Sequence, residues 1–187
     1  MVDFLKKQQL TNNQISELLA NAQILNVKKH TILLKEKEKA NRIYFVESGI
    51  LRSGIHKDES KNCTYCFYSP EGLRWAGLSA NSLLRKPSDY FIEVLEDAQI
   101  ISFDLIYFQK LRHTNLEWAN FFQCQLLTVY SYLEQKSVNQ LKLSPEERYL
   151  AFIETNPTII KNIPLHYIAS YIGVVPESLS RIRRRLN

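Results

Sequence analysis

The sequence predicts an α+β protein: an antiparallel β domain comes first, a long helix follows, and a small helical domain ends the chain. Short segments rich in β-branched and aromatic residues, separated by turn residues, fill residues 31–103. An unbroken helical pattern runs from about Asn115 to Gln140, and two short helical patterns separated by a glycine come last. Strands followed by helices, rather than alternating with them, are typical of this fold class. We expect three parts, at residues 1–113, 114–141 and 142–187.

The β domain is expected to begin with a short helix. Thr11 or Asn12 can cap a helix over residues 11–22, which carry an apolar stripe. Strands are expected at residues 31–34, 42–46, 50–55, 63–68, 90–95 and 100–103. Gly49 separates the second strand from the third, and the turn Glu96-Asp97-Ala98 joins the last two. Short antiparallel strands at this spacing favour a barrel or a sandwich.

The long helical pattern predicts a helix of roughly 40 Å, at about 1.5 Å per residue. A typical helix has only about 11–12 residues. Apolar positions alternate in steps of three and four, as in a coiled-coil seam. The seam consists of Ala119, Phe122, Leu126, Val129 and Leu133. We expect one face to pack on the β domain and the seam to meet a second copy of the chain. The alternative is one broad face buried within a single chain.

A hinge is expected at Leu141-Lys142-Leu143, where the long pattern ends. Ser144-Pro145-Glu146-Glu147 then predicts a helix start, because the serine can cap, the proline suits the first position and Glu147 completes a capping box. This helix should end near Asn156-Pro157, and residues 158–163 should connect it to the last two helical patterns.

The two C-terminal patterns predict a helix-turn-helix. Ala169 is the small residue needed where two steeply crossing helices touch, and Gly173 can adopt the positive φ of the turn. Pro164 and Pro176 fall near the starts of the two helices. The remaining inner positions are apolar: Ile168, Ile172, Val174, Leu179, Ile182 and Leu186. The combined spacing is a stronger signal than any single residue.

The outer face of the last helix has the chemistry of a DNA-reading surface. Arginines such as Arg181 and Arg184 can bind guanine in a bidentate way, and Glu177 can accept a hydrogen bond from cytosine N4. Arg183 and Arg185 suit phosphates, which position a protein without reading sequence. The expected DNA-binding residues are Glu177, Ser178, Arg181, Arg183, Arg184 and Arg185. The alternative is an ordinary helical hairpin with a solvated basic tail, since basic residues also complement the C-terminal end of a helix dipole.

Composition and charge narrow the class of protein. The chain has 187 residues, 45% of them apolar, and a net charge of +5, so it can bury a core but has no strongly basic coat. Four arginines concentrate in the last helix, which fits a local contact with nucleic acid. No apolar run is long enough for a membrane span, and no apolar signal core is present. We therefore expect a cytoplasmic protein with no membrane partner.

Metal, disulfide and enzymatic chemistry have little support. The three cysteines do not form a disulfide framework, and Cys63 and Cys66 should point to opposite faces of a strand. The four histidines are scattered with no H-x-H pair, which argues against a cupin-like metal enzyme. Neither a G-x-S-x-G motif nor a phosphate loop is present. We expect reduced thiols, no metal, no cofactor and no catalytic residue.

Two segments carry a resemblance to a known family. Residues 42–52 (R-I-Y-F-V-E-S-G-I-L-R) look like a family hairpin with its glycine. Residues 146–157 (E-E-R-Y-L-A-F-I-E-T-N-P) and 163–183 (I-P-L-H-Y-I-A-S-Y-I-G-V-V-P-E-S-L-S-R-I-R) look like its DNA-binding end. With this order of parts, the whole chain resembles the Crp–Fnr family of bacterial transcriptional regulators. The resemblance implies a jelly-roll-like β-roll of the cyclic-nucleotide-binding type, a dimerisation helix and a C-terminal helix-turn-helix.

The resemblance also implies an effector pocket, whose cyclic-nucleotide cassette is degenerate in this chain. Family members that bind cyclic nucleotides use a Gly-Glu pair for the ribose and an arginine for the cyclic phosphate. Gly77 is kept, but Leu78 stands where the acid would be and Ser88 where the arginine would be, and Asp89 adds a negative charge. A phosphate without its arginine loses its main charge-assisted hydrogen bonds. We therefore expect no binding of cyclic AMP.

Other departures concern the DNA-binding end and the sensing chemistry. Glu177 and Arg181 match positions that family members use against base edges, but Pro176 stands where a base-reading arginine can occur, so the operator should differ. We expect no β-hairpin wing after the last helix, and therefore fewer phosphate contacts, weaker binding and a smaller dependence of binding on salt. The first cysteine is Cys63, so the N-terminal cysteine cluster of oxygen-sensing members is missing.

The leading hypothesis is a homodimeric, sequence-specific transcription regulator that binds double-stranded DNA and is not an enzyme. A small-molecule effector and RNA polymerase are further candidate partners. The β-roll would bias the hinge at Leu141–Ser144 and thereby the placement of two recognition helices. The alternative is a dimeric ligand-sensing or protein-interaction module that does not bind DNA. A cupin-like enzyme is the third reading.

Overall fold

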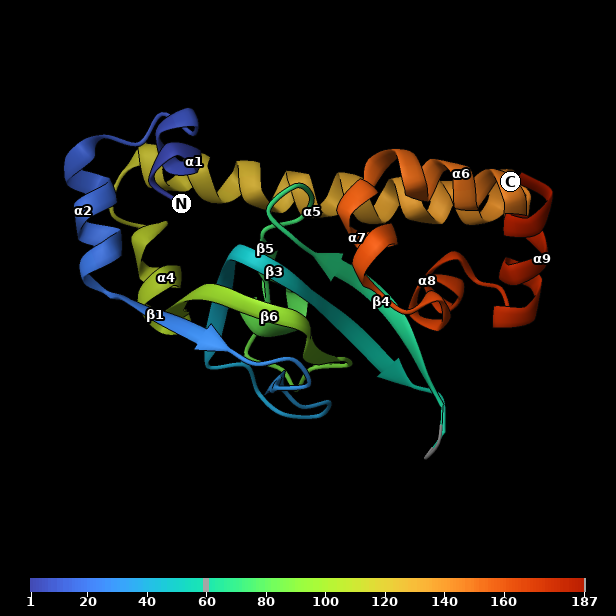
Figure 1. Ribbon diagram of the computed structural model, residues 1–187. Coiled ribbons are helices and arrows are strands. Elements are labelled where there is room, and N and C mark those ends of the chain that lie inside the picture. The colour runs from blue at the N-terminus through green and yellow to red at the C-terminus, as the bar shows by residue number, and fades with distance from the viewer. Residues whose placement is uncertain (59–60, 187) are drawn as a thin grey trace.

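The computed structural model describes residues 1–58 and 61–186. Figure 1 shows a twisted antiparallel sheet with short helices at one end, a long helix that crosses the sheet, and a group of helices at the C-terminal end. Glu59 and Ser60, in a predicted polar turn, and the last residue, Asn187, lie outside the described residues. The order of elements confirms the predicted α+β class, with an N-terminal antiparallel β-roll, a long helix and a C-terminal helix-turn-helix.

The β-roll is a single antiparallel sheet of six strands within the described residues. The strands are β1 (Ala22–Val27), β2 (Ile32–Leu34), β3 (Arg42–His56), β4 (Asn62–Tyr68), β5 (Trp75–Ala76) and β6 (Phe91–Asp104). They are ordered β1-β6-β3-β4, with β2 also paired to β6 and β5 also paired to β3. The sheet is therefore organised around the two longest strands, β3 and β6.

The predicted strand breaks at Gly49 and at Glu96-Asp97-Ala98 are wrong. β3 and β6 continue through these positions and pair with each other on both sides of them. The register shifts in this stretch, so the glycine lies in a bulged region rather than at a strand end. Gly49 has a φ of +83°, and a Cβ there would lie 2.5 Å from the carbonyl oxygen of Asp97. The glycine therefore allows two continuous strands to approach each other closely.

Short helices α1 (Val2–Lys7), α2 (Asn12–Ala20) and α4 (Leu105–Leu111) gather at one end of the sheet. Helix α3 (Ala80–Leu83) lies apart from them, between β5 and β6 in the chain. α2 is the predicted first helix, and Thr11 forms a capping box with Gln14 at its start. Neither α1, α4 nor strand β1 was predicted. α4 follows directly on β6, where the side chain of Asp104 accepts a hydrogen bond from the backbone N–H of Tyr107.

Aromatic side chains form the centre of the β-roll core. Trp75 is 4% exposed and its ring contacts several others. The centroids of Phe45, Phe108, Phe103 and Phe121 lie 5.0, 5.1, 5.7 and 6.3 Å from its ring. Phe121 belongs to the long helix, so this cluster fastens that helix to the sheet.

The predicted long helix is present as α5 (Leu116–Lys142). The side chain of Asn115 caps it by accepting a hydrogen bond from the N–H of Trp118. The first half of the helix buries Trp118, Phe121 and Phe122, whereas many side chains of the second half are exposed. No helix in the described ranges combines the length and the apolar character needed to cross a membrane.

The C-terminal unit consists of short helices that follow a two-residue break at Leu143 and Ser144. They are α6 (Pro145–Thr155), α7 (Pro157–Asn162), α8 (Leu165–Ile172) and α9 (Pro176–Leu186). Ser144 and Glu147 form the predicted capping box at the start of α6. α7 occupies the segment that was expected to be a plain connection.

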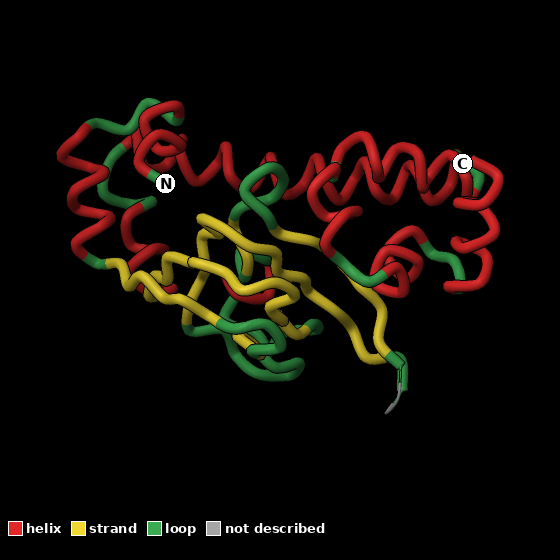
Figure 2. The backbone as a smooth tube through the Cα atoms, in the orientation of Figure 1, coloured by secondary structure: helices red, strands yellow, loops and turns green. Residues whose placement is uncertain are grey.

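The C-terminal unit packs directly on the β-roll. The ring of Phe67 on β4 lies 5.8 Å from that of Phe152 on α6 and 5.3 Å from that of Tyr171 on α8. Ile50 and Leu95 of the sheet belong to the same apolar cluster. Figures 1 and 2 show α8 beside β4. The sheet and the helix-turn-helix therefore share a core, and the position of α8 depends on the sheet.

Candidate functional site

α8 and α9 form the predicted helix-turn-helix. Gly173 ends α8 with a φ of 77° and a ψ of 36°, a left-handed conformation that glycine adopts without a steric penalty. The N–H of Val174 donates to the carbonyl oxygen of Ala169 at 2.9 Å. Ala169 itself is 0% exposed. Ala169 is therefore at the predicted contact between the two helices, and Gly173 is at the predicted turn.

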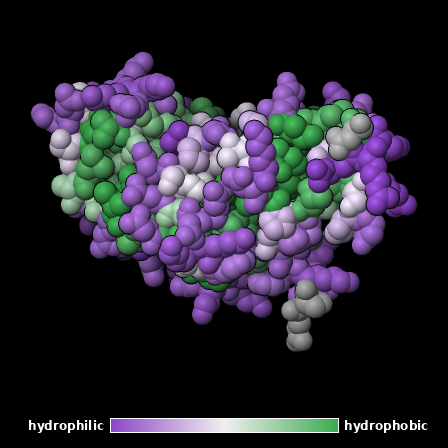
Figure 3. Space-filling view, in the orientation of Figure 1, coloured by the Kyte–Doolittle hydropathy of each residue, from purple (hydrophilic) through white to green (hydrophobic). Residues whose placement is uncertain are grey.

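α9 has an apolar face and a charged face. Leu179 and Ile182 are buried, whereas Leu186 in the last turn is 40% exposed. Of the predicted DNA-binding residues, Glu177, Arg181, Arg184 and Arg185 are exposed, and Ser178 and Arg183 are half-buried. Figure 3 shows hydrophilic side chains gathered at the end of the molecule where α9 lies. A single helix therefore presents all six predicted residues.

Contacts within the chain involve only part of this charged face. Arg185 pairs with Glu146 of α6 at 2.8 Å. Nη2 of Arg181 donates to Oγ of Ser178 at 3.3 Å. Among the described residues, Glu177 and Arg184 have no ion-pair partner within 4.0 Å. The groups expected to read bases are therefore not neutralised by salt bridges within the described chain.

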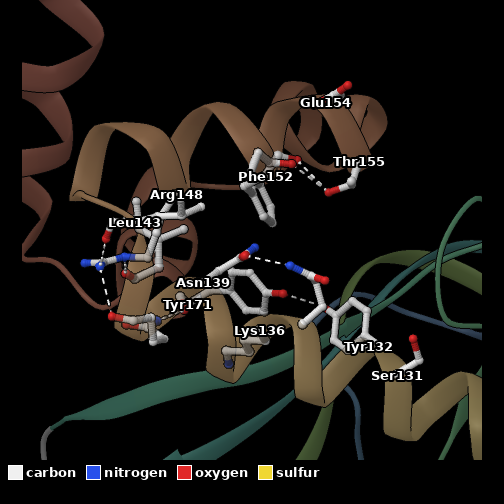
Figure 4. Close-up of a pocket in the computed structure, with 14 residues that line it drawn as sticks. Ser131, Tyr132, Lys136, Asn139, Leu143, Arg148, Phe152, Glu154, Thr155 and Tyr171 are labelled. Atoms are coloured by element: carbon white, nitrogen blue, oxygen red, sulfur yellow. Dashed lines mark hydrogen bonds between the residues drawn. The ribbon is translucent and has the colours of Figure 1, made fainter.

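Behind the turn lies Arg148, which the sequence did not single out. Its Nε donates to the carbonyl oxygen of Ile172 at 2.8 Å, and its Nη1 donates to that of Leu143 at 2.8 Å. Figure 4 shows the guanidinium among the hydrogen bonds that join these segments. Arg148 thus connects the segment between α5 and α6 to the end of α8 through hydrogen bonds. The sequence around Arg148 gives no sign that its side chain binds these two backbone carbonyls, because charged residues are common near the start of a helix.

A second cluster that was not predicted joins the β-roll to α8. Arg52 on β3 is 2% exposed, and its Nε and Nη2 donate to Oε2 of Glu93 on β6 at 2.9 and 2.7 Å. Its Nη1 donates to Asn62 at 2.8 Å and to Thr64 at 3.3 Å. The ring of Tyr167 on α8 covers the guanidinium, with 4.1 Å between the ring centroid and Cζ. The helix-turn-helix therefore rests on a buried charge of the sheet.

The long helix also holds α8 in place. The hydroxyls of Tyr132 and Tyr171 lie 2.7 Å apart. Nζ of Lys136 donates to the carbonyl oxygen of Tyr65 at 2.6 Å and lies 4.3 Å from the ring centroid of Tyr171. Burial lowers the pKa of Lys136. Figure 4 shows Tyr132, Lys136 and Tyr171 along a cleft of about 480 Å³ between α5, α6 and α8.

The β-roll contains a separate cavity of about 450 Å³ that opens against α5. Leu78 and Asp89, two of the predicted effector-pocket residues, line it. Gly77, with a φ of +87°, and Ser88, whose Oγ donates to the carbonyl oxygen of Tyr90 at 2.6 Å, are not among its lining residues. Only two of the four cassette positions therefore face this space.

Comparison with known proteins yields matches among solved structures. No protein-family model and no curated protein matches the chain. FixK2 from Bradyrhizobium japonicum has a TM-score of 0.76 at 17% identity, covering 88% of this chain and 84% of that one. A regulator assigned to the Crp/Fnr family, from Eubacterium rectale, has a TM-score of 0.74 at 21% identity, covering 95% and 84%. The c-di-GMP-responsive regulator CLP of Xanthomonas campestris has a TM-score of 0.67 at 13% identity, covering 94% and 91%.

The chain has the Crp/Fnr fold. The matched regions include 88–95% of its length, so the likeness extends from the β-roll to the helix-turn-helix. TM-scores of 0.67–0.76 show the shared fold, and at identities of 13–21% they show the fold alone. One fold can host several functions, so the function is argued below from the residues of this chain.

Within this Crp/Fnr fold, the predicted dimer seam is divided between the core of the chain and its surface. Phe122 is 4% exposed, and its ring centroid lies 4.5 Å from that of Phe108. The other seam positions are less buried: Ala119, Val129 and Leu133 are half-buried, and Leu126 is 37% exposed. Packing on the β-roll thus leaves Phe122 little surface for a second copy.

The cysteines of this Crp/Fnr fold are separate thiols. Cys66 is buried, Cys63 is half-buried and Cys124 is exposed. Burial raises the pKa of the Cys66 thiol to about 12. Within residues 1–58 and 61–186, no group of three or more His, Cys, Asp or Glu side chains is arranged to hold a metal ion.

Proposed function

We propose that the protein is a homodimeric regulator of transcription that binds double-stranded DNA in a sequence-specific manner. The charged outer face of α9 carries this proposal. That helix is backed by buried Leu179 and Ile182, while Glu177, Arg181 and Arg184 face solvent. A helix presented in this way fits the major groove, where exposed side chains reach base edges.

The residues of α9 divide into readers and positioning groups. Arg181 and Arg184 suit guanine O6 and N7, and Glu177 suits cytosine N4. Ser178 holds Arg181 through its hydroxyl and can also meet a base or a phosphate. Arg183 and Arg185 suit phosphates, and Arg185 would exchange Glu146 for a phosphate oxygen on binding.

Exposed apolar side chains near the middle of α5 support a homodimer. Leu126, Leu127 and Tyr130 are 37%, 55% and 62% exposed. Together with Ala119 and Phe122 they line a shallow apolar hollow of about 490 Å³. Exposed apolar surface on a helix is typical of an interface, and a two-fold dimer would present two α9 helices to paired half-sites. We expect Leu127→Glu combined with Tyr130→Glu to give a monomer in light scattering.

The β-roll is proposed not to bind cyclic AMP. Its cavity has Leu78 and Asp89 at cassette positions, and no lysine or arginine is among the described residues that line it. A phosphate there would meet a carboxylate instead of a guanidinium. Calorimetric detection of micromolar cyclic AMP binding would contradict this part of the proposal.

Operator selection from random duplex DNA, followed by fluorescence anisotropy, tests DNA binding. Arg181→Ala with Arg184→Ala should weaken binding to the selected operator by about 30-fold or more, since each base contact contributes at least about 1 kcal/mol. The matched control is Lys6→Ala with Lys7→Ala, which removes two positive charges from exposed residues of α1, far along the chain from α9. Failure to enrich any sequence, or equal losses in the two double variants, would refute the assignment of α9.

A further inference from the structure

The cavity of the β-roll that faces α5 is a mainly apolar hollow. It has contributions from β3, β4, β5, α3 and α5, so the sheet and the long helix both wall it. Its aromatic lining consists of Tyr65, Tyr68, Trp75, Tyr90 and Tyr130. Its volume of about 450 Å³ lies in the range of small-molecule sites, about 300–1,000 Å³.

The polar groups of this lining are largely uncharged. Burial raises the pKa of Tyr90 to about 12 and that of Tyr68 well above its ordinary value, so both phenols keep their protons at neutral pH. The hydroxyl of Tyr68 lies 3.2 Å from Oγ of Ser53, so these two groups form a hydrogen bond with each other within the sheet. The Cys66 thiol is likewise neutral, because burial raises its pKa to about 12. Two phenols and a thiol therefore add no charge to the cavity.

The charges near the cavity disfavour an anion. Asp89 is the one charged side chain among the described lining residues, and its Oδ2 accepts a hydrogen bond from Nδ2 of Asn81 at 2.7 Å. Lys136 is nearby in the fold, but it lines the separate cleft between α5 and α6, and its Nζ is bound to the carbonyl oxygen of Tyr65. Among the described lining residues an anion would meet a carboxylate and no lysine or arginine, and it would lose its hydration.

We propose that this cavity binds an uncharged, mainly aromatic small molecule. Flat rings would pack between the tyrosines of the sheet and the apolar side chains of α5. That such a molecule acts as an effector rests on the proposed regulatory function, but its binding does not. The ligand would contact Leu126, Val129 and Leu133, which belong to the predicted dimer seam. Ligand binding would therefore alter the packing where two long helices meet.

Two fluorescent probes with the same aromatic skeleton test the charge rule. N-phenyl-1-naphthylamine is uncharged, whereas 1-anilinonaphthalene-8-sulfonate carries a sulfonate. We expect the full chain to bind one equivalent of the uncharged probe at least about tenfold more tightly than the anionic one. The net charge of +5 would favour the opposite order for non-specific binding. Equal affinity, tighter binding of the anion, or no binding of the uncharged probe would overturn the proposal.

Variants locate the site. Leu78→Arg places a cation in the lining and should weaken binding of the uncharged probe by about tenfold while improving that of the anion. Ile55→Arg is a gentler version, because Ile55 lines the cavity but is 36% exposed, so it remains informative if Leu78→Arg does not fold. Leu84→Arg is the matched control, since Leu84 is 63% exposed and does not line the cavity.

The pattern across the variants decides the outcome. Loss of preference for the uncharged probe in Ile55→Arg, with the control unchanged, supports the cavity as the site. If folded Ile55→Arg and Leu84→Arg bind both probes as the unaltered chain does, the site lies elsewhere and the proposal fails. No DNA is present in these titrations, so their result stands apart from the test of α9.

Discussion

Replacing Glu93 by leucine should reveal how strongly one buried ion pair supports both the β-roll and the helix-turn-helix. The side chains of Arg52 and Glu93 are 2% and 12% exposed, and two hydrogen bonds of 2.9 and 2.7 Å join them. Glu93→Leu leaves the guanidinium buried without its carboxylate. The hydrogen bonds to Asn62 and Thr64 remain, but neither partner supplies a compensating charge.

Breaking a buried pair in this way costs about 3–5 kcal/mol. With a urea m-value of about 2 kcal/mol per M, the unfolding midpoint should fall by about 1.5–2.5 M. The assay is urea unfolding at one protein concentration, followed by circular dichroism. Hydrogen exchange should also quicken in α8, because Tyr167 stacks on the same guanidinium at 4.1 Å.

A second substitution and a control make the reasoning refutable. Adding Arg52→Met to Glu93→Leu should recover most of the lost stability, since an apolar pair of similar volume carries no buried charge. Lys28→Met removes an ion pair of similar length, 2.8 Å, whose side chains are 86% and 57% exposed, and it should leave the midpoint unchanged. A midpoint for Glu93→Leu within error of the unaltered chain, or no recovery in the double variant, would refute the role assigned to the pair.

Three further outcomes are expected. Gly173→Ala, at a φ of 77°, should lower stability by about 1–2 kcal/mol in thermal unfolding, whereas Gly72→Ala, whose Cβ would meet nothing closer than 3.5 Å, should not. A thiol reagent at pH 8 should label Cys124 quickly and Cys66 only on unfolding, because Cys66 is buried with a pKa of about 12. Burial, and then a nearby guanidinium, lower the pKa of His166. The imidazole of His166 therefore binds a proton less readily in the folded state than in the unfolded state, so stability should fall as the pH drops below about 6.5. His166→Gln should remove the contribution of this imidazole to the pH dependence of the urea midpoint.

The elements that sequence reasoning recovered are those set by local patterns. The capping boxes at Thr11 and Ser144 depend on residues three positions apart, and both are present. Gly173 and Ala169 depend on the four-residue spacing of one helix turn, and both occupy their expected places. The length of α5 follows from an unbroken apolar periodicity with no proline within it.

The predictions from sequence were wrong or incomplete where one local pattern is compatible with two different structures. Gly49 is a reasonable strand break, yet it serves as a point of close approach between β3 and β6. Asp104 is both the last residue of β6 and the cap of α4, with no turn between the two elements, so α4 was not predicted. Phe122 fits a coiled-coil seam by spacing, but the β-roll buries it, and spacing alone does not say which partner covers an apolar side chain.

The sequence by itself determined the order of parts, the helix-turn-helix and the charged face of α9, because hydrogen bonding and amphipathic spacing within one helix act over a few residues. Only the tertiary structure decided that Arg52 and Glu93, 41 residues apart, share a buried site beneath α8. The same holds for the neutral, aromatic cavity, whose walls come from the sheet, α3 and α5. Contacts between such distant residues arise when strands pair and helices dock, and no local pattern records which side chains then meet.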